Sequence, residues 1–140
     1  MNSLQIVNME DFELNWRWTQ ESYTVISEDD LVSIKPLSKE SASSIFEAAN
    51  ELMRITKVES KGTKIECSGQ HIDFLNDNLT EEQIVISWGK ETAVKTNTSI
   101  FIKYFDDFCY PSSDDIAIWP QSKKWLLTYQ HFEVLCFARL

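Results

Sequence analysis

The sequence predicts an α+β domain in which a single antiparallel sheet has two main helices packed on it. Two segments, 39–55 and 98–109, place apolar residues three and four positions apart, which is typical of helices buried along one face. Short runs rich in β-branched residues surround these segments, and the last three runs are joined by connections too short for a crossover. We therefore expect an antiparallel sheet of about five strands.

The whole chain, 1–140, fits one domain. A length of 140 residues is enough for a substantial core, and no internal repeat, low-complexity segment or Pro/Gly/Ser-rich linker divides the sequence. Apolar residues make up 43% of the chain and aromatic residues 12%, a composition that favours a packed globule and excludes general disorder.

The N-terminal part combines an alternating segment with a short helical turn. Apolar and polar residues alternate over 12–18, a period of two that predicts a half-buried strand or an extended arm. Its two tryptophans, Trp16 and Trp18, fit core packing, and a partner-binding patch is the alternative. Ser27 is followed by three acidic residues, which predicts a capped helical turn over 31–34.

The clearest helix follows, over 39–55, with Ser38 as its N-cap. Its pattern is that of an ordinary amphipathic helix lying against a sheet. The polar segment 57–62 then predicts a loop, 63–68 a short strand, and the turn-rich 70–82 an exposed connection.

The middle of the chain predicts a hairpin followed by the second helix. The β-branched run 83–88 is expected to be a central strand, and 91–96 to pair with it through a tight turn. Asn97 is placed to cap the helix over 98–109, whose aromatic residues follow helical spacing. Pro111 should stop that helix, because proline lacks an N–H and restricts the residue before it.

The C-terminal segments 115–119, 124–129 and 133–138 are short apolar runs with brief polar connections. Such short connections join antiparallel neighbours. We therefore expect these three strands to form a meander.

The charge is strongly acidic, with 22 acidic and 13 basic residues giving a formal net charge of −9. A chain of this charge is repelled by phosphate backbones, which argues against direct nucleic-acid binding. It suits a soluble protein, or one that meets a basic partner.

The cysteines and the N-terminus indicate a cytoplasmic protein that does not enter a membrane. Cys67, Cys109 and Cys136 are odd in number, far apart and without CxxC spacing, as expected of reduced thiols in the cytoplasm. The N-terminus has no basic region followed by an apolar run, so we expect neither a signal peptide nor a membrane span.

We find no motif for catalysis, metal binding or cofactor binding. His71 and His131 are the only histidines, and no ligand pairs have zinc spacing. With three glycines in total, the chain has no phosphate-cradling loop. We therefore expect no enzymatic activity and no cofactor. The alternative is a small hydrolase or transferase that uses His131 with Asp114 or Cys109, although apolar surroundings would leave a thiol inert.

The segment 104–120 holds the most distinctive cluster, an aromatic helix end, a Pro-Ser-Ser turn and two pairs of aspartates. Charged runs are usually solvated, and an aspartate after a turn often caps it. Partner binding is the third possibility for these carboxylates. They are Asp106, Asp107, Asp114 and Asp115.

Residues 104–133, with the pattern Y-F-D-D-F-C-Y-P-S-S-D-D followed by W-L-L-x-Y-x-H-x-E, resemble the C-terminal part of small bacterial immunity proteins. These are encoded beside polymorphic or contact-dependent growth-inhibition toxins. The resemblance implies a cytoplasmic protein without enzymatic activity that neutralises one cognate toxin by tight binding. An acidic inhibitor suits a basic, nuclease-like toxin, because it imitates the phosphate chain.

A partner surface can be named on this hypothesis. We expect it to contain the following residues: Asp106, Asp107, Tyr110, Asp114, Asp115 and Trp119. If these residues are not the site, the acidic run 28–30 or the face of Trp16 and Trp18 is the next choice. A further hypothesis is that the chain is a regulatory scaffold whose partner is not a toxin.

Overall fold

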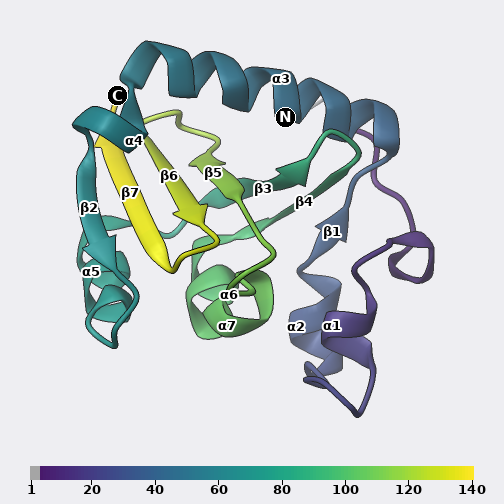
Figure 1. Ribbon diagram of the computed structural model, residues 1–140. Coiled ribbons are helices and arrows are strands. Elements are labelled where there is room, and N and C mark those ends of the chain that lie inside the picture. Colours follow the sequence, from purple (N-terminus) through teal and green to yellow (C-terminus); the bar gives the residue numbers. More distant parts are fainter. Residues whose placement is uncertain (1–3) are drawn as a thin grey trace.

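The computed structural model describes residues 4–140 and centres on one antiparallel sheet (Figure 1). In chain order the strands are β1 (Lys35–Pro36), β2 (Thr63–Glu66), β3 (Gln83–Gly89), β4 (Thr92–Asn97), β5 (Ile116–Pro120), β6 (Trp125–Gln130) and β7 (Val134–Arg139). The seven strands lie in the order β1-β4-β3-β5-β6-β7-β2, and each pair of neighbours is antiparallel. The α+β prediction is confirmed, with seven strands in place of about five.

Helices cover both faces of the sheet, as Figure 1 shows with α3 above it and most of the shorter helices below. One face carries α3 (Lys39–Thr56) and α4 (Val58–Lys61). The other carries the 3₁₀ turn η1 (Met9–Asp11) and the helices α1 (Trp16–Thr19), α2 (Glu28–Val32), α5 (His71–Asn78), α6 (Thr98–Lys103) and α7 (Phe105–Phe108). The two predicted main helices therefore pack on opposite faces.

The two-residue period of the strands divides the core into two clusters. In β3, Ile84 and Ile86 face the larger cluster, which includes the fully buried Trp18 and Phe108. Val85 between them faces α3. Because almost every side chain of the central strands is buried on one face or the other, these strands lack polar alternation.

The helix predicted over 39–55 is confirmed as α3, which runs one residue further. Ser38 caps it, with Oγ accepting a hydrogen bond from the N–H of Ser41. At its other end Lys57 adopts the left-handed conformation, with φ of 50°, and its N–H bonds the carbonyl of Met53. The chain then turns directly into α4, where a loop was expected, and this prediction was wrong.

The second predicted helix is present but divided. Asn97 caps α6 as expected, its side chain accepting a hydrogen bond of 3.0 Å from the N–H of Ile100. Tyr104 leaves the helical conformation, with φ of −114° and ψ of 32°, and separates α6 from α7. Its hydroxyl donates to the carboxylate of Asp30. Phe105 keeps the buried position that the spacing predicts.

Two further predictions were wrong, one in the N-terminal part of the chain and one in its middle. Residues 12–18 form no strand: a turn of 3₁₀ helix precedes Phe12 and α1 follows it, so Trp16 and Trp18 do not share one face. The connection predicted over 70–82 contains α5. Its apolar residues Ile72, Leu75 and Leu79 do have helical spacing, but polar neighbours hide so short a pattern. The hairpin and the C-terminal meander are confirmed.

Candidate partner-binding face

A buried ion pair joins the N-terminal part of the chain to the turn before β5. The guanidinium of Arg17 donates two hydrogen bonds to the carboxylate of Asp114, at 2.7 and 3.0 Å. Their side chains are only 5% and 7% exposed. The same carboxylate accepts a bond of 2.9 Å from the N–H of Tyr110, which closes the turn after α7.

Because Asp114 is buried and bonded to Arg17, it is not available to a partner. Its predicted place in the partner surface is corrected accordingly. The turn residue lies inside the molecule because Arg17 compensates its charge there. The alternative prediction for this aspartate was that it caps the turn. The hydrogen bond that it accepts from the N–H of Tyr110 agrees with that prediction.

Aromatic rings gather around the guanidinium of Arg17. Its Cζ lies 4.0 Å from the ring centroid of Tyr110 and 5.3 Å from that of Trp16. The rings of Trp16 and Tyr110 are 5.7 Å apart, and those of Trp16 and Tyr23 are 4.7 Å apart. We call these three residues, Trp16, Tyr23 and Tyr110, the aromatic face. Tyr23 is 51% exposed, and the other two are half-buried.

The acidic pair on α7 divides between two sides of the helix. Asp107 is half-buried and accepts a hydrogen bond of 2.6 Å from the hydroxyl of Thr24, next to Tyr23. Its charge acts on Tyr110, whereas the charge of the exposed Asp106 acts on Cys67. Asp107 therefore borders the aromatic face, and Asp106 belongs to the side toward the end of β2.

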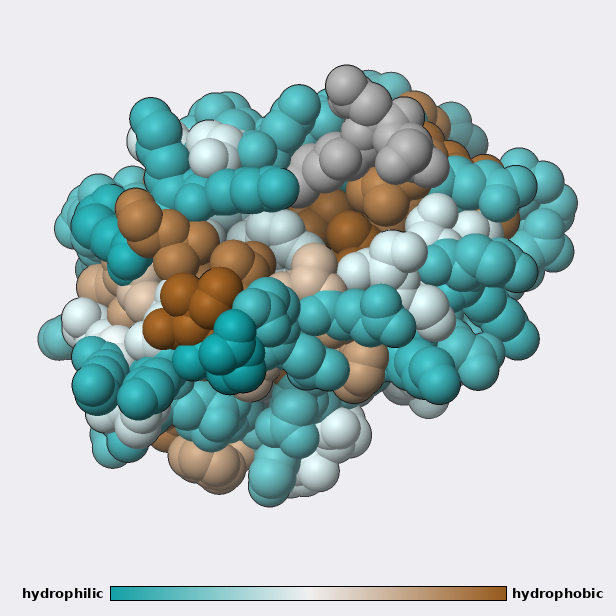
Figure 2. Space-filling model, turned by 90° about the horizontal axis from the view of Figure 1, so that it is seen from above, coloured by the Kyte–Doolittle hydropathy of each residue, from teal (hydrophilic) through white to brown (hydrophobic). Residues whose placement is uncertain are grey.

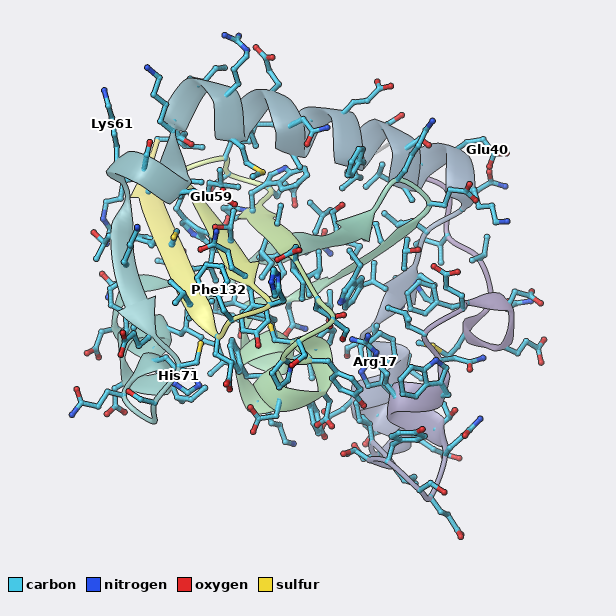
Figure 3. The ribbon with its side chains drawn as sticks, in the orientation of Figure 1. Arg17, Glu40, Glu59, Lys61, His71 and Phe132 are labelled. Atoms are coloured by element: carbon cyan, nitrogen blue, oxygen red, sulfur yellow. The ribbon has the colours of Figure 1, made fainter. Side chains whose placement is uncertain are left out.

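The fourth carboxylate, Asp115, is exposed and contacts the turn between β6 and β7. It accepts from the backbone N–H of His131 at 3.0 Å, and its Oδ1 lies 3.0 Å from Nδ1 of that ring. Burial raises the pKa of Asp115, but the bonds from His131 outweigh this and leave the pKa below its usual value. The adjoining Phe132 is 59% exposed at the tip of the turn, labelled in Figure 3 together with Arg17.

Trp119, predicted as an anchor for the partner, is 3% exposed and cannot serve as one. The two-residue period of β5 turns it toward α3 together with Ala117. Tyr110, the other predicted anchor, stays at the surface.

The groups of the alternative catalytic site are not arranged as that hypothesis requires. The ring of His131 contacts Asp115, while the carboxylate of Asp114 is bound by Arg17. Cys109 is buried, and this burial raises its pKa well above the usual value. Within residues 4–140, no group of three or more His, Cys, Asp and Glu side chains is placed to hold a metal ion.

Cys67 gives a direct test of thiol reactivity. Burial, assisted by the charges of Glu133 and Asp106, raises the pKa of its thiol to about 11 from an ordinary 9.0. Because the thiolate is the reactive form, iodoacetamide at pH 8 should alkylate Cys67 about a hundredfold more slowly in the folded protein than in urea. The rate should rise about tenfold per pH unit below the raised pKa. Mass spectrometry of the Cys67 peptide measures both rates, and equal rates would contradict the raised pKa.

The sequence reasoning missed Arg17 and Tyr23. A signal for the first was present, since Arg17 stands between two tryptophans in the run Trp-Arg-Trp, where a charge needs a compensating partner once buried. Tyr23 lies in a polar stretch with no periodicity, and nothing in the sequence marks it.

Comparisons with protein-family models, with curated proteins and with solved structures find no match to this chain. No helix within the described residues 4–140 is long and apolar enough to cross a membrane.

Proposed function

We propose that this chain is an immunity protein that binds a cognate, basic, nuclease-like bacterial toxin domain and neutralises it by occlusion. The observation that carries the proposal is the aromatic face, supported from beneath by Arg17 and bordered by Asp107. Tyrosine, tryptophan and arginine are the residues that most often dominate binding energy in protein interfaces. The resemblance of residues 104–133 to immunity proteins gives the class of partner.

The charge supports the same class. A nuclease needs a basic surface to hold phosphates, and a chain with a net charge of −9 attracts such a surface and speeds the encounter. Asp107 stands next to the aromatic rings, so charge and apolar contact area are available at one place. The same net charge disfavours nucleic acid as the direct partner.

The support beneath the face favours tight binding. Trp16 and Tyr110 are held against Arg17, whose guanidinium is in turn fixed by two bonds to a buried carboxylate. Rings that are already in place lose little rotational freedom when a partner binds, and this raises affinity. The proposed activity needs no cofactor and no catalytic residue.

Co-expression with the toxin gene next to this one tests the proposal. We expect the chain to rescue growth and to co-purify with a toxin domain inactivated by substitution in its own active site. An unrelated nuclease toxin is the control, and it should be neither neutralised nor bound. Failure of both rescue and co-purification with the neighbouring toxin would overturn the proposal. Co-purification of a partner that is not a basic enzyme would favour the regulatory scaffold.

A further inference from the structure

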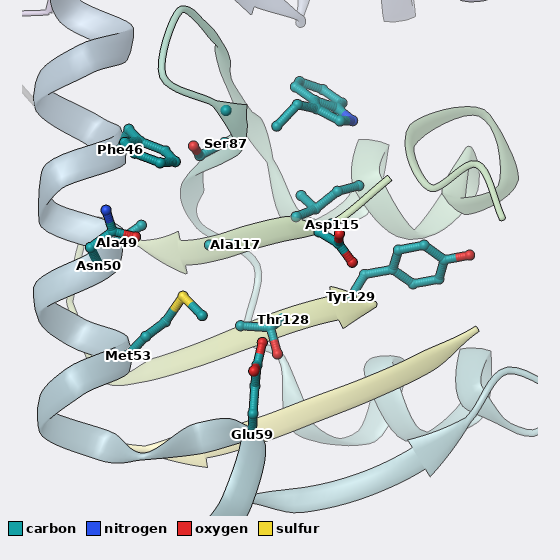
Figure 4. Close-up of a pocket in the computed structure, with 13 residues that line it drawn as sticks. Phe46, Ala49, Asn50, Met53, Glu59, Ser87, Asp115, Ala117, Thr128 and Tyr129 are labelled. Atoms are coloured by element: carbon teal, nitrogen blue, oxygen red, sulfur yellow. The ribbon is translucent and has the colours of Figure 1, made fainter. Parts of the chain in front are cut away.

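A pocket of about 160 Å³ lies between α3 and the sheet (Figure 4). At this place the sheet presents small side chains to α3: Ser87 of β3, Ala117 of β5 and Thr128 of β6. They leave part of the space between the helix and the strands unfilled. Met53 of α3 contributes an apolar wall. The volume is below the roughly 300–1,000 Å³ of sites for drug-sized ligands, and it suits a single side chain.

The polar lining of this pocket combines hydroxyl and amide groups with negative charge at the rim. Two exposed carboxylates line it, Glu59 from α4 and Asp115, the residue before β5. Among the described residues around it there is no lysine, arginine or histidine. The ring of His131 contacts Asp115 from the neighbouring turn, and the carboxylate keeps a lowered pKa and thus its charge at neutral pH.

A buried hydroxyl lies in the wall of this pocket. Thr128 is 2% exposed, and its Oγ bonds no nitrogen or oxygen in the part of the chain that the structure describes, while the thiol of Cys136 lies within its hydrogen-bonding reach. Figure 4 shows this hydroxyl and the carboxylate of Glu59 directed toward one another across the pocket. A buried hydroxyl that lacks a nitrogen or oxygen partner is unfavourable, so a bound donor that hydrogen-bonds it gains affinity.

We propose that the pocket receives the side chain of a lysine or arginine of the partner protein. The aliphatic stem would lie along Met53 and Ala117, and the N–H donors would meet the carboxylates of Glu59 and Asp115 and the hydroxyl of Thr128. The inference rests on the proposed function in that the basic toxin domain is the source of this side chain. A positively charged partner supplies such side chains in number.

The pocket and the aromatic face are close enough for one partner. Tyr110 and Asp115 are five residues apart in the chain, so their Cα atoms are separated by no more than about 18 Å. A standard interface covers about 800 Å² on each side, which is wide enough to include both. The toxin would thus bury a basic side chain beside α3 while it covers Tyr110.

A first experiment uses small probes and needs no toxin. Nα-acetyl-lysine methylamide and Nα-acetyl-arginine methylamide are titrated into the ¹⁵N-labelled chain, with the neutral norleucine analogue as reference. We expect saturable shifts at the amides of Ser87, Ala117 and Thr128, with dissociation constants on the order of millimolar. Absence of saturation, shifts confined to other regions, or equal binding of the norleucine analogue would overturn the inference.

Variants then assign the binding to the pocket. Glu59→Gln should weaken the lysine probe at least tenfold, and Thr128→Val, which keeps the shape and removes the hydroxyl, should also weaken it. Glu47→Gln is the matched control, since Glu47 is an exposed acid on α3 that does not line the pocket. Equal loss in Glu59→Gln and Glu47→Gln would show a general charge effect and would contradict the specific site. Retained amide dispersion in each spectrum confirms that the variants are folded.

A second experiment separates this inference from the proposed function. Affinity of the inactivated toxin domain is measured for the unchanged chain, for Glu59→Gln and for Glu47→Gln, with at least a tenfold loss expected for Glu59→Gln alone. If the toxin does not bind the unchanged chain, the proposed function fails while the probes still report on the pocket. If the toxin binds and Glu59→Gln has no effect, the pocket inference fails and the proposed function stands.

Discussion

Replacing Arg17 by methionine should lower the free energy of unfolding by about 3–5 kcal/mol, because it leaves the carboxylate of Asp114 buried without its counter-charge. Both side chains are almost fully enclosed, so water cannot replace the lost bonds. The guanidinium also contacts the rings of Trp16 and Tyr110, and its loss removes the support of the aromatic face. Urea denaturation followed by tryptophan fluorescence measures the change.

The matched control is Arg54→Met, which breaks the exposed pair of Arg54 with Glu51 on α3. Exposed pairs contribute about 0–1 kcal/mol, so this variant should remain close to the unchanged chain. Asp114→Asn in the Arg17→Met background should recover part of the lost stability, because it removes the uncompensated charge and keeps an acceptor for the N–H of Tyr110. Equal stability of Arg17→Met and Arg54→Met would contradict the importance of the buried pair.

Replacing Tyr23 by alanine should weaken the toxin complex at least 30-fold, about 2 kcal/mol, if the aromatic face is the centre of the interface. Tyr23 is 51% exposed and packs on Trp16 alone among the aromatic residues, so the fold should be kept. Calorimetry with the inactivated toxin domain gives the affinity, and the unfolding curve of the free variant gives its stability.

Ile55→Ala is the control for loss of exposed apolar area. Ile55 is 61% exposed near the end of α3, on the opposite face of the sheet. Figure 2 looks onto α3 and shows a surface that is mostly hydrophilic, with hydrophobic side chains gathered in a few places. We expect the affinity of this variant to be unchanged. An affinity that falls in Ile55→Ala and not in Tyr23→Ala would exclude the aromatic face from the interface.

The contribution of the carboxylates to binding must be tested with Asp114 left unchanged, because replacing this buried residue affects the stability of the fold. Among the other three predicted positions, Asp107 and Asp115 lie nearest to the aromatic face and the pocket. Replacing both by asparagine removes charge that steers the encounter, so its effect on the association rate should shrink at high salt.

The elements that could be predicted from the sequence are those whose signals come from residues close together in the chain. The spacing over 39–55, the caps Ser38 and Asn97 and the short connections between the last strands are local signals, and each of these elements is present. The helix α5 and the break at Tyr104 were missed because short helices carry too few periodic residues to be distinguished from a polar loop or from a continuous helix.

The aromatic face could be predicted only in part, because it is assembled by contacts between distant residues. Tyr110 and Asp107 were named, yet the Trp16 and Tyr23 rings that complete the face lie far from them in sequence. Asp114 and Asp115 are adjacent and chemically identical, and one is buried while the other is exposed. Asp114 is paired with Arg17, 97 residues away, whereas Asp115 contacts His131.

That separation has a consequence for when the protein becomes active during synthesis. Contacts between residues far apart in sequence form late, after the intervening chain has been made and has folded. A ribosome that has released only the first hundred residues has delivered Trp16 and Tyr23 but neither Tyr110 nor the carboxylate that anchors Arg17. We expect chains that end before Tyr110 to lack the aromatic face, so that any binding at this face begins only after residues 110–114 have been made and have folded.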